Sequence, residues 1–529
     1  MFGSLAVLAS QRSENCTNFN PSTRLLRWPE PIRRLWHSNY GWISLLQPIL
    51  YILVFSAELV VFRKFRSVAV RQAALVAGSY VLYCTWSRWF FAVLLASTVM
   101  NHLLGEWVRR RPYWPALTSG IVLNLILLGT FKYLPPVAIV LPFASLQRFA
   151  HLALPLGMSF WTFQAMSYLF DQFQGEELAP TFAEFAIFMA FFPVTISGPI
   201  CRMPEMLPQF RSAEKVPWSA MERGFQRIAT GILMMQLAKL LGQGILSGDS
   251  INTGFDSLTR WTGPDVWCLA IGYGLQLFFD FAGYSHIAIG AAQMLGIRVP
   301  ENFAHPFQST SPSVFWTRWH MSLSFWIRDY VFLPLAVLRR QMWWRNAVLI
   351  FAMALFGVWH KATLLFVLWG CYHGVLLVLH RQVQQLRRRF NWDPPAQPWG
   401  AFSWVTTIGL ISLGWIFFRA ATLAEARHMF SAVLSPSSYG FHFLSGSLYL
   451  LVVGLIAGYV GVLFAAKKVA VYSSQQRSTA SNQADGIIGV LIQKRWLWLP
   501  PLYALTLLVV TVVTFTQGTN AAQLVYRRF

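Results

Sequence analysis

Long apolar blocks, separated by short basic or Pro/Gly-rich stretches, constrain this sequence more than any other feature. The blocks cover residues 43–62, 68–86, 88–105, 117–134, 152–170, 182–200, 225–247, 266–295, 314–338, 346–380, 402–418, 446–466 and 499–516. Most are near the ~20 residues that a helix needs to cross ~30 Å of hydrocarbon. Only 12% of the 529 residues are charged, about half the share usual in soluble proteins. We therefore predict an all-α polytopic membrane protein with about 11 to 13 membrane segments, some of them re-entrant or short hairpin helices. Soluble enzymes, fibrous proteins and disordered regulators are excluded.

The basic residues lie in the gaps between these blocks. Lys and Arg total 42 against 20 Asp and Glu, a net charge of +22. Basic groups of this kind occur at 63–71, 109–111, 339–345, 387–389 and 467–468. The pattern is typical of cytoplasmic loops under the positive-inside rule. Nucleic acid is not an expected partner, because no polar domain is present to form a binding groove.

The organisation that we expect has four parts. Residues 1–41 form a basic N-terminal extension, and 42–150 contain N-terminal transmembrane segments. The central part, which contains the motifs described below, covers 151–400. Residues 401–529 contain C-terminal transmembrane segments with a flexible polar loop at 467–495, which is rich in Ser, Gln and Asn.

The block from Asn346 to His380 is too long for one span, because a single helix of 35 residues would extend about 52 Å. Basic clusters flank it on both sides. If both stay cytoplasmic, the segment enters the membrane and returns, with its turn near Gly357–His360. We therefore expect His360 deep in the protein interior, at a buried turn.

Among the histidines inside predicted membrane segments, His320, His360 and His373 lie close together in the sequence. Ionisable residues there are candidate functional groups because burying them is costly, and imidazole is suited to proton transfer. The alternative is that each is a hydrogen-bonded packing residue, which we favour for His373. On one straight helix His360 and His373 would lie about 220° apart, so a shared site requires a break in the helix.

Other site chemistries have little support. No HxxxH, HExxH or similar ligand spacing is present, so no metal site is expected. No GxSxG or P-loop motif occurs either. A transporter or channel with Asp280, His286 and His320 on an ion path is an alternative, weakened by the lack of detectable repeat symmetry.

A series of motifs from about Leu154 onward resembles the membrane-bound O-acyltransferase family, in particular its alginate O-acetylase branch. The motifs are Leu154–Leu169, Phe191–Ile200, Phe279–His286, Glu301–Phe303, Phe315–Ser324, Arg328–Tyr330, Gly357–His360 and Leu368–Gly374. Weaker similarity covers Asn124–Tyr133 and the closing Tyr526–Phe529.

The resemblance implies transfer of an acyl group, most often acetyl, from cytoplasmic acyl-CoA to a hydroxyl of an exported or cell-surface polysaccharide. His360 matches the family's catalytic histidine, His320 matches a second essential one, and His373 matches a third family histidine. It also implies a central tunnel, the bacterial cytoplasmic (inner) membrane as location, and no bound cofactor. Transfer is either direct or through an extracytoplasmic acetyltransferase partner, with membrane lipid around the chain.

Several residues near these histidines are candidates for supporting roles. They are Arg318, Trp319, Arg328, Asp329, Asp280 and Trp359. Nearby donors would stabilise the oxyanion that develops during acyl transfer. Lys361 stands where the family commonly has glycine, and we expect its charge to act on His360. D-alanyl transfer toward teichoic acid, or fatty acyl transfer to a lipid, is the alternative within the enzyme class.

Overall fold

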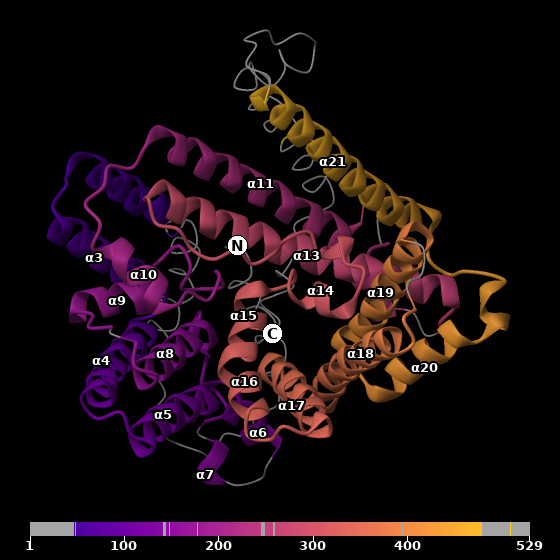
Figure 1. Ribbon diagram of the computed structural model, residues 1–529, viewed down its shortest axis with the longest axis horizontal. Helices are drawn as coiled ribbons and strands as arrows, with labels where there is room; N and C mark the ends of the chain where they lie inside the picture. Colours follow the sequence, from indigo (N-terminus) through magenta and orange to yellow (C-terminus); the bar gives the residue numbers. More distant parts are fainter. Residues whose placement is uncertain are drawn as a thin grey trace, which may run out of the picture.

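The computed structural model describes residues 49–478, apart from 141–143, 148, 177, 245–248, 258–259 and 393–395, together with residues 47 and 508. All regular elements in this part of the chain are helices (Figure 1). Residues 1–41 and the predicted span at 499–516, residue 508 apart, lie outside it.

The N-terminal half begins with a helical segment at 49–64. The helices that follow are α3 (Val68–Trp86), α4 (Arg88–Arg110), α5 (Trp114–Lys132), α6 (Leu134–Val140), α7 (Ala144–Gln147), α8 (Met158–Phe173), α9 (Phe182–Ala190), α10 (Met203–Phe210), α11 (Trp218–Gln243) and α12 (Ile251–Ser257). Serine side chains before α3 and α4 accept hydrogen bonds from backbone N–H groups of the first turn, which satisfies donors that a helix start leaves unpaired.

The remaining elements surround the long helix α13. They are α13 (Gly263–Met294), η1 (Pro306–Gln308), α14 (Pro312–Trp316), α15 (Met321–Ile327), the π-helical turn η2 (Arg328–Phe332), α16 (Leu333–Ala336), α17 (Met342–His360), α18 (Leu364–Arg389), α19 (Ala396–Arg419), α20 (Leu423–Leu434), η3 (Pro436–Tyr439) and α21 (Gly446–Ser478). Helix α21 extends away from the body of the protein (Figure 1).

Eight of the described helices are long and apolar enough to cross a membrane: α3, α4, α5, α13, α17, α18, α19 and α21. A polytopic all-α membrane protein is therefore confirmed. The predicted polar loop at 467–495 is wrong in its first part, because α21 continues to Ser478.

Two apolar runs that we expected as spans are broken into short elements. Helix α9 ends at Ala190, in a stretch where Pro193, Gly198 and Pro199 follow. The run at 314–338 forms α14, α15, η2 and α16 instead of one helix. His320 interrupts it with a left-handed backbone, φ 44° and ψ 52°, and such a conformation cannot continue a right-handed helix.

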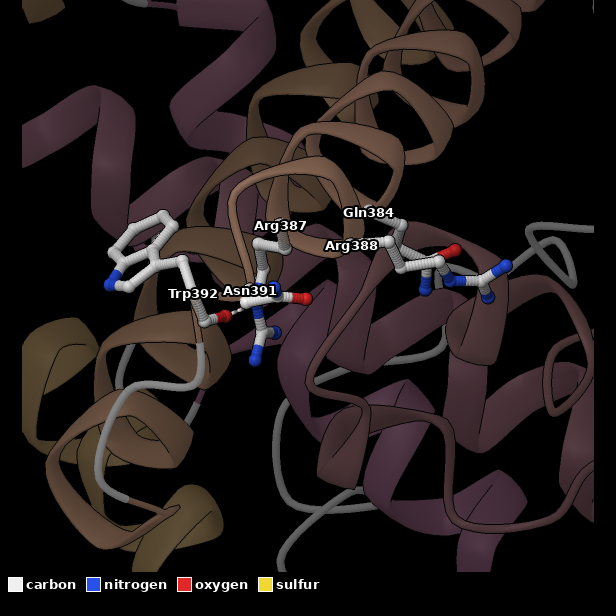
Figure 2. A pocket seen from close by; sticks show the side chains of 5 residues that line it. All are labelled: Gln384, Arg387, Arg388, Asn391 and Trp392. Atoms are coloured by element: carbon white, nitrogen blue, oxygen red, sulfur yellow. Dashed lines mark hydrogen bonds between the residues drawn. The ribbon is translucent and has the colours of Figure 1, made fainter.

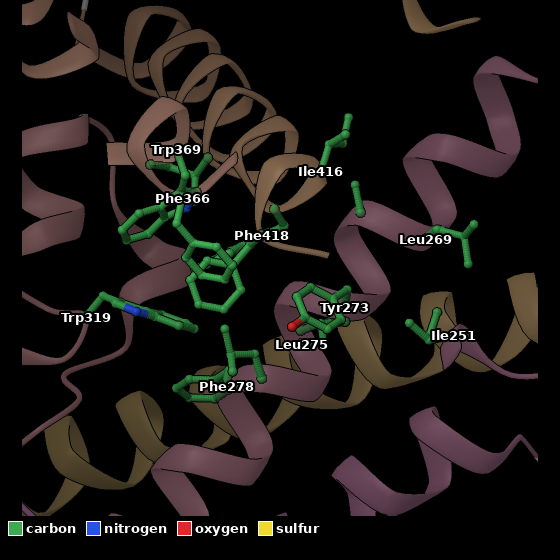
Figure 3. Packing of buried hydrophobic residues seen from close by; sticks show 14 of the residues in the cluster. Ile251, Leu269, Tyr273, Leu275, Phe278, Trp319, Phe366, Trp369, Ile416 and Phe418 are labelled. Carbon is green, nitrogen blue, oxygen red and sulfur yellow. The ribbon is translucent and has the colours of Figure 1, made fainter. Parts of the chain in front are cut away.

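Helix α13 joins two hydrophobic cores. Its first part packs with α14, α15 and α17–α21, and its last part packs with α3–α5 and α8–α10. Figure 3 shows the first core, where side chains from α13, α18 and α19 meet Trp319. The backbones of α11 and α13 approach each other closely, because a Cβ on Gly231 of α11 would lie 2.4 Å from the carbonyl oxygen of Gly283 in α13.

Helices α17 and α18 form the hairpin predicted for the 346–380 block. They are antiparallel, and Arg381 near the end of α18 donates a hydrogen bond to Asn346 near the start of α17, 3.1 Å. Close contact near the turn requires glycine, because a Cβ on Gly357 would lie 1.9 Å from the Phe366 carbonyl oxygen. The predicted position of the turn is wrong, since it comes at 361–363, after His360, and is exposed. Each helix is long enough to cross the membrane, so the chain need not turn at a buried depth.

Candidate functional site

His360 is the last residue of α17 and lies in a box of aromatic rings. Its imidazole is stacked on Phe356, with ring centroids 5.3 Å apart, and is 4.6 Å from Trp359. Trp369 of α18 and Phe418 of α19 close the other sides, at 5.5 and 5.1 Å. Only 6% of the residue is exposed. The prediction of a buried His360 is confirmed, and aromatic packing explains its burial.

His320 begins α15, and its ring is fixed by Asn302. The Asn302 side-chain oxygen lies 3.0 Å from His320 Nδ1 and also accepts hydrogen bonds from the hydroxyl and backbone N–H of Ser322, 2.8 and 3.4 Å. Because a backbone N–H only donates, the accepting atom is the amide oxygen and not the nitrogen. His320 Nδ1–H therefore donates to it, and Nε2 is the basic nitrogen of the neutral ring. Burial lowers the pKa of His320 to about 3, so the ring is neutral at physiological pH.

Two rings of α17 connect the two histidines. The Phe356 ring lies 6.4 Å from His320, and the Trp359 ring lies at the same centroid distance. Both rings also pack against His360. The structure thus brings His320 and His360, which are 40 positions apart in the sequence, into one cluster with Trp359.

His373 lies one layer behind this cluster. Its ring is 5.0 Å from Trp369 and 5.2 Å from Trp316, and Trp369 separates it from His360. The residue is fully buried, and within the described chain neither ring nitrogen has a hydrogen-bond partner. The packing role that we favoured for His373 fits this position better than contact with a substrate.

The other predicted supporting residues are divided between the site and its surroundings. Trp319 is buried in the same core and stacks on Phe315. Asp280 is buried in α13, next to Phe281, whose ring packs edge-on against His320 at 4.6 Å. Arg318 is partly exposed.

Arg328 and Asp329 belong to a separate polar cluster on η2. Asp329 forms an ion pair with Arg202 at 2.6 Å and with Arg328 at the same distance. Tyr330 beside them donates a hydrogen bond to Asp171, 2.7 Å. Trp326 and then Phe163 lie between Tyr330 and the Trp359 ring. The structure therefore does not bring this cluster to the histidines.

Lys132, the last residue of α5, reaches the end of α17 together with the next residue, Tyr133. The sequence did not indicate them as part of the site. The Lys132 ammonium donates a hydrogen bond to the Trp359 carbonyl and lies 4.7 Å from the centre of the Trp359 ring. The Tyr133 hydroxyl donates to the Val358 carbonyl, 3.2 Å. A lysine at the end of an apolar run was the available signal, within the weakly similar segment Asn124–Tyr133.

Lys132 packs on the ring of Trp359, the residue before His360. Lys361 begins the exposed turn after α17, and its effect on His360 stays a prediction. Within the described residues no group of three His, Cys, Asp or Glu side chains could hold a metal ion.

A basic pocket lies at the opposite end of the hairpin from His360. It has a volume of about 450 Å³ and is lined by Gln384, Arg387, Arg388, Asn391 and Trp392 (Figure 2). From Leu364 to Arg387 helix α18 rises about 35 Å, so this pocket is remote from the imidazoles. A predicted tunnel through the protein stays a prediction.

Comparison with known proteins agrees with the motif series. Residues 138–421 match the model of the membrane-bound O-acyltransferase family. A probable alginate O-acetylase of Pseudomonas syringae is 30% identical over 79% of this chain and 80% of its own length. A peptidoglycan O-acetyltransferase of Helicobacter pylori is 30% identical over 66% of the chain and 71% of its length. A teichoic acid D-alanyltransferase of Bacillus subtilis is 31% identical over 50% of the chain and 68% of its length. The chain, a multi-pass O-acyltransferase, therefore belongs to the membrane-bound O-acyltransferase family.

Proposed function

We propose that this enzyme transfers an acetyl group from cytoplasmic acetyl-CoA to a hydroxyl of an exported or cell-surface polysaccharide, with His360 as the catalytic base. The observation that carries the proposal is the convergence of two buried imidazoles, His360 and His320, on the rings of Phe356 and Trp359. Both histidines stand in motifs that resemble those of the family's essential histidines.

In the proposed reaction the His360 imidazole takes the proton of the acceptor hydroxyl as its oxygen attacks the thioester carbonyl. A bond forms between that oxygen and the acyl carbon, and the carbon–sulfur bond then breaks. The imidazolium returns the proton to the leaving thiolate, which restores the neutral base. The surrounding aromatic rings keep water from the thioester, and so favour transfer over hydrolysis.

His320 supports this reaction through a fixed tautomer. With its Nδ1–H held by Asn302, Nε2 is the accepting nitrogen of the neutral ring, and the ring packs against Phe281, Phe356 and Trp359. We propose that Nε2 accepts a hydrogen bond from the acceptor hydroxyl and orients it toward His360.

The nature of the acceptor is inferred from the relatives. Two of the proteins named above act on polymers that contain sugars, alginate and peptidoglycan, and both are named for O-acetyl transfer. The third is named for D-alanyl transfer to teichoic acid, which is the main alternative for donor and acceptor. Mass spectrometry of the modified polymer separates acetyl, D-alanyl and longer acyl products.

The arrangement of charge supports a location in the bacterial cytoplasmic membrane. Arg345, Arg381 and Arg387–Arg389 lie at one end of the α17–α18 hairpin, and His360 lies at the other. With the basic end in the cytoplasm, His360 lies toward the side at which an exported acceptor, or an extracytoplasmic partner transferase, arrives.

The test is transfer of radiolabelled acetyl from acetyl-CoA by purified protein in lipid vesicles, and polysaccharide acetylation in cells. His360→Ala should reduce transfer by about 100- to 10,000-fold, the usual contribution of a general base. His428→Ala, at an exposed histidine of α20, is the matched control and should retain activity. Normal polysaccharide acetylation in the His360→Ala strain would refute the proposal.

A further inference from the structure

The end of α17 is held by two consecutive residues from a helix more than 200 positions earlier in the chain. Lys132 donates to the Trp359 carbonyl, and Tyr133 donates to the Val358 carbonyl. The next carbonyl back, that of Gly357, accepts the backbone N–H of Lys361 at 3.2 Å. The last turn of α17 therefore has three successive carbonyls satisfied, two of them by Lys132 and Tyr133 at the end of α5.

These hydrogen bonds pair carbonyl groups that the end of a helix leaves unpaired. The last four carbonyls of a helix have no partner within it, and inside a membrane protein little water is present to replace one. The helix dipole also places partial negative charge at this end, where a lysine ammonium is favourable. A lysine inside a membrane span is costly unless it is paired, and here the carbonyl and the Trp359 ring are its partners.

We propose that Lys132 is a positioning residue, whose ammonium group, assisted by the Tyr133 hydroxyl, fixes the last turn of α17 and with it the orientation of His360. The inference rests on the proposed catalytic role of His360. Lys132 acts through the backbone of Trp359, the residue directly before His360, and through the Trp359 ring, which also contacts His320. Its loss would disturb both imidazoles together.

Such a role predicts a specific kinetic signature. In the proposed role Lys132 contacts Trp359 and not the acyl donor, so KM for acetyl-CoA should change little. The chemical step depends on imidazole placement, and a misplacement of about 1 Å lowers rates by about 100-fold. Lys132→Met, which keeps the length of the side chain but removes the charge and the donor, should therefore lower kcat by about 10- to 100-fold.

Three further variants define the mechanism. Lys132→Arg retains a cationic donor and should recover a large part of kcat. Tyr133→Phe removes one neutral hydrogen bond and should lower kcat by less than about tenfold. Lys239→Met is the matched control, because Lys239 is a half-buried lysine of α11 that lies outside the site.

A second measurement does not depend on activity. Hydrogen exchange of the amides at 357–363, followed by mass spectrometry in lipid nanodiscs, should be faster in Lys132→Met than in wild type, with Lys239→Met unchanged. Wild-type kcat in Lys132→Met, or unchanged exchange at 357–363, would overturn the inference. A wild-type protein that transfers no acetyl, or a His360→Ala variant with full activity, would instead refute the proposed function.

Discussion

Asn302 offers the sharpest test of how the site is organised. The residue is fully buried, and its side-chain oxygen is the partner of His320 Nδ1 and of Ser322. Its amide nitrogen donates to Ser285 of α13, 3.1 Å. A change from Asn302 to Asp keeps the size and the accepting oxygen but adds a negative charge beside the imidazole.

The added charge should raise the pKa of His320. An adjacent opposite charge raises the pKa of a histidine by about 1 to 3 units, which moves the His320 value from about 3 to roughly 4 to 6. The proposed role requires a neutral ring, so activity is lost as the pH falls below this pKa. In wild type that loss lies below the range of most assays, whereas in Asn302→Asp it falls between about pH 4 and 6.

The assay is kcat/KM for acetyl transfer in lipid vesicles from pH 4.5 to 8. We expect near wild-type activity of Asn302→Asp at pH 8 and an acid limb shifted upward. Asn302→Leu, which removes the acceptor, leaves buried donors unpaired at about 1 to 3 kcal/mol each and should be inactive. Ser285→Ala is the control, because it affects only the far side of the amide. An unshifted acid limb in Asn302→Asp, together with activity in Asn302→Leu, would refute a role for the fixed tautomer.

Two further predictions concern packing and pH-dependent stability. Gly357→Ala places a methyl 1.9 Å from the Phe366 carbonyl oxygen, so α17 and α18 must separate. We expect a stability loss of about 1 to 3 kcal/mol and about 100-fold lower kcat. The control Gly454→Ala has open space at the Cβ and should change neither thermal unfolding nor activity. Equal behaviour of the two variants would contradict close contact between α17 and α18. The pKa of His320 is about 3 in the folded protein and about 6.5 in the unfolded chain. The folded protein therefore loses stability as the pH falls, because the unfolded state takes up the proton first. Between pH 7 and 5 this amounts to roughly 2 kcal/mol, so thermal unfolding of His320→Asn should depend less steeply on pH than that of wild type, and parallel curves would refute it.

Hydropathy predicted the membrane spans well where a run is uninterrupted, as in α3 and α4. It failed at 314–338, where apolar content is high but α14 ends at Trp316 and the left-handed backbone of His320 precedes a new helix, α15. A window average measures whether a segment prefers lipid to water. It carries no information on whether the segment stays helical, and in this protein the interrupted run is the one that places His320.

The site could be predicted in part for a related reason. His320 and His360 stand in recognisable motifs, and the length of the 346–380 block required a chain reversal near His360. Lys132 could not be assigned, because its role depends on a contact across more than 200 residues with a backbone carbonyl, a group that every residue carries. Asn302 was part of a motif, but nothing in the motif indicated a hydrogen bond to His320.

Asn302 and Lys132, which the sequence did not indicate, both support a histidine by pairing a polar group in an apolar surrounding. In an apolar interior each polar group needs a partner. Here the partners hold the two histidines at positions away from the proposed reaction: Asn302 at Nδ1 of His320, and Lys132 at the backbone before His360. The rings of both histidines pack against aromatic side chains from α13, α17, α18 and α19. Water would compete with the acceptor hydroxyl for the thioester, so a site that keeps its polar supports away from the proposed reaction and packs apolar rings against the imidazoles favours the slower and bulkier nucleophile.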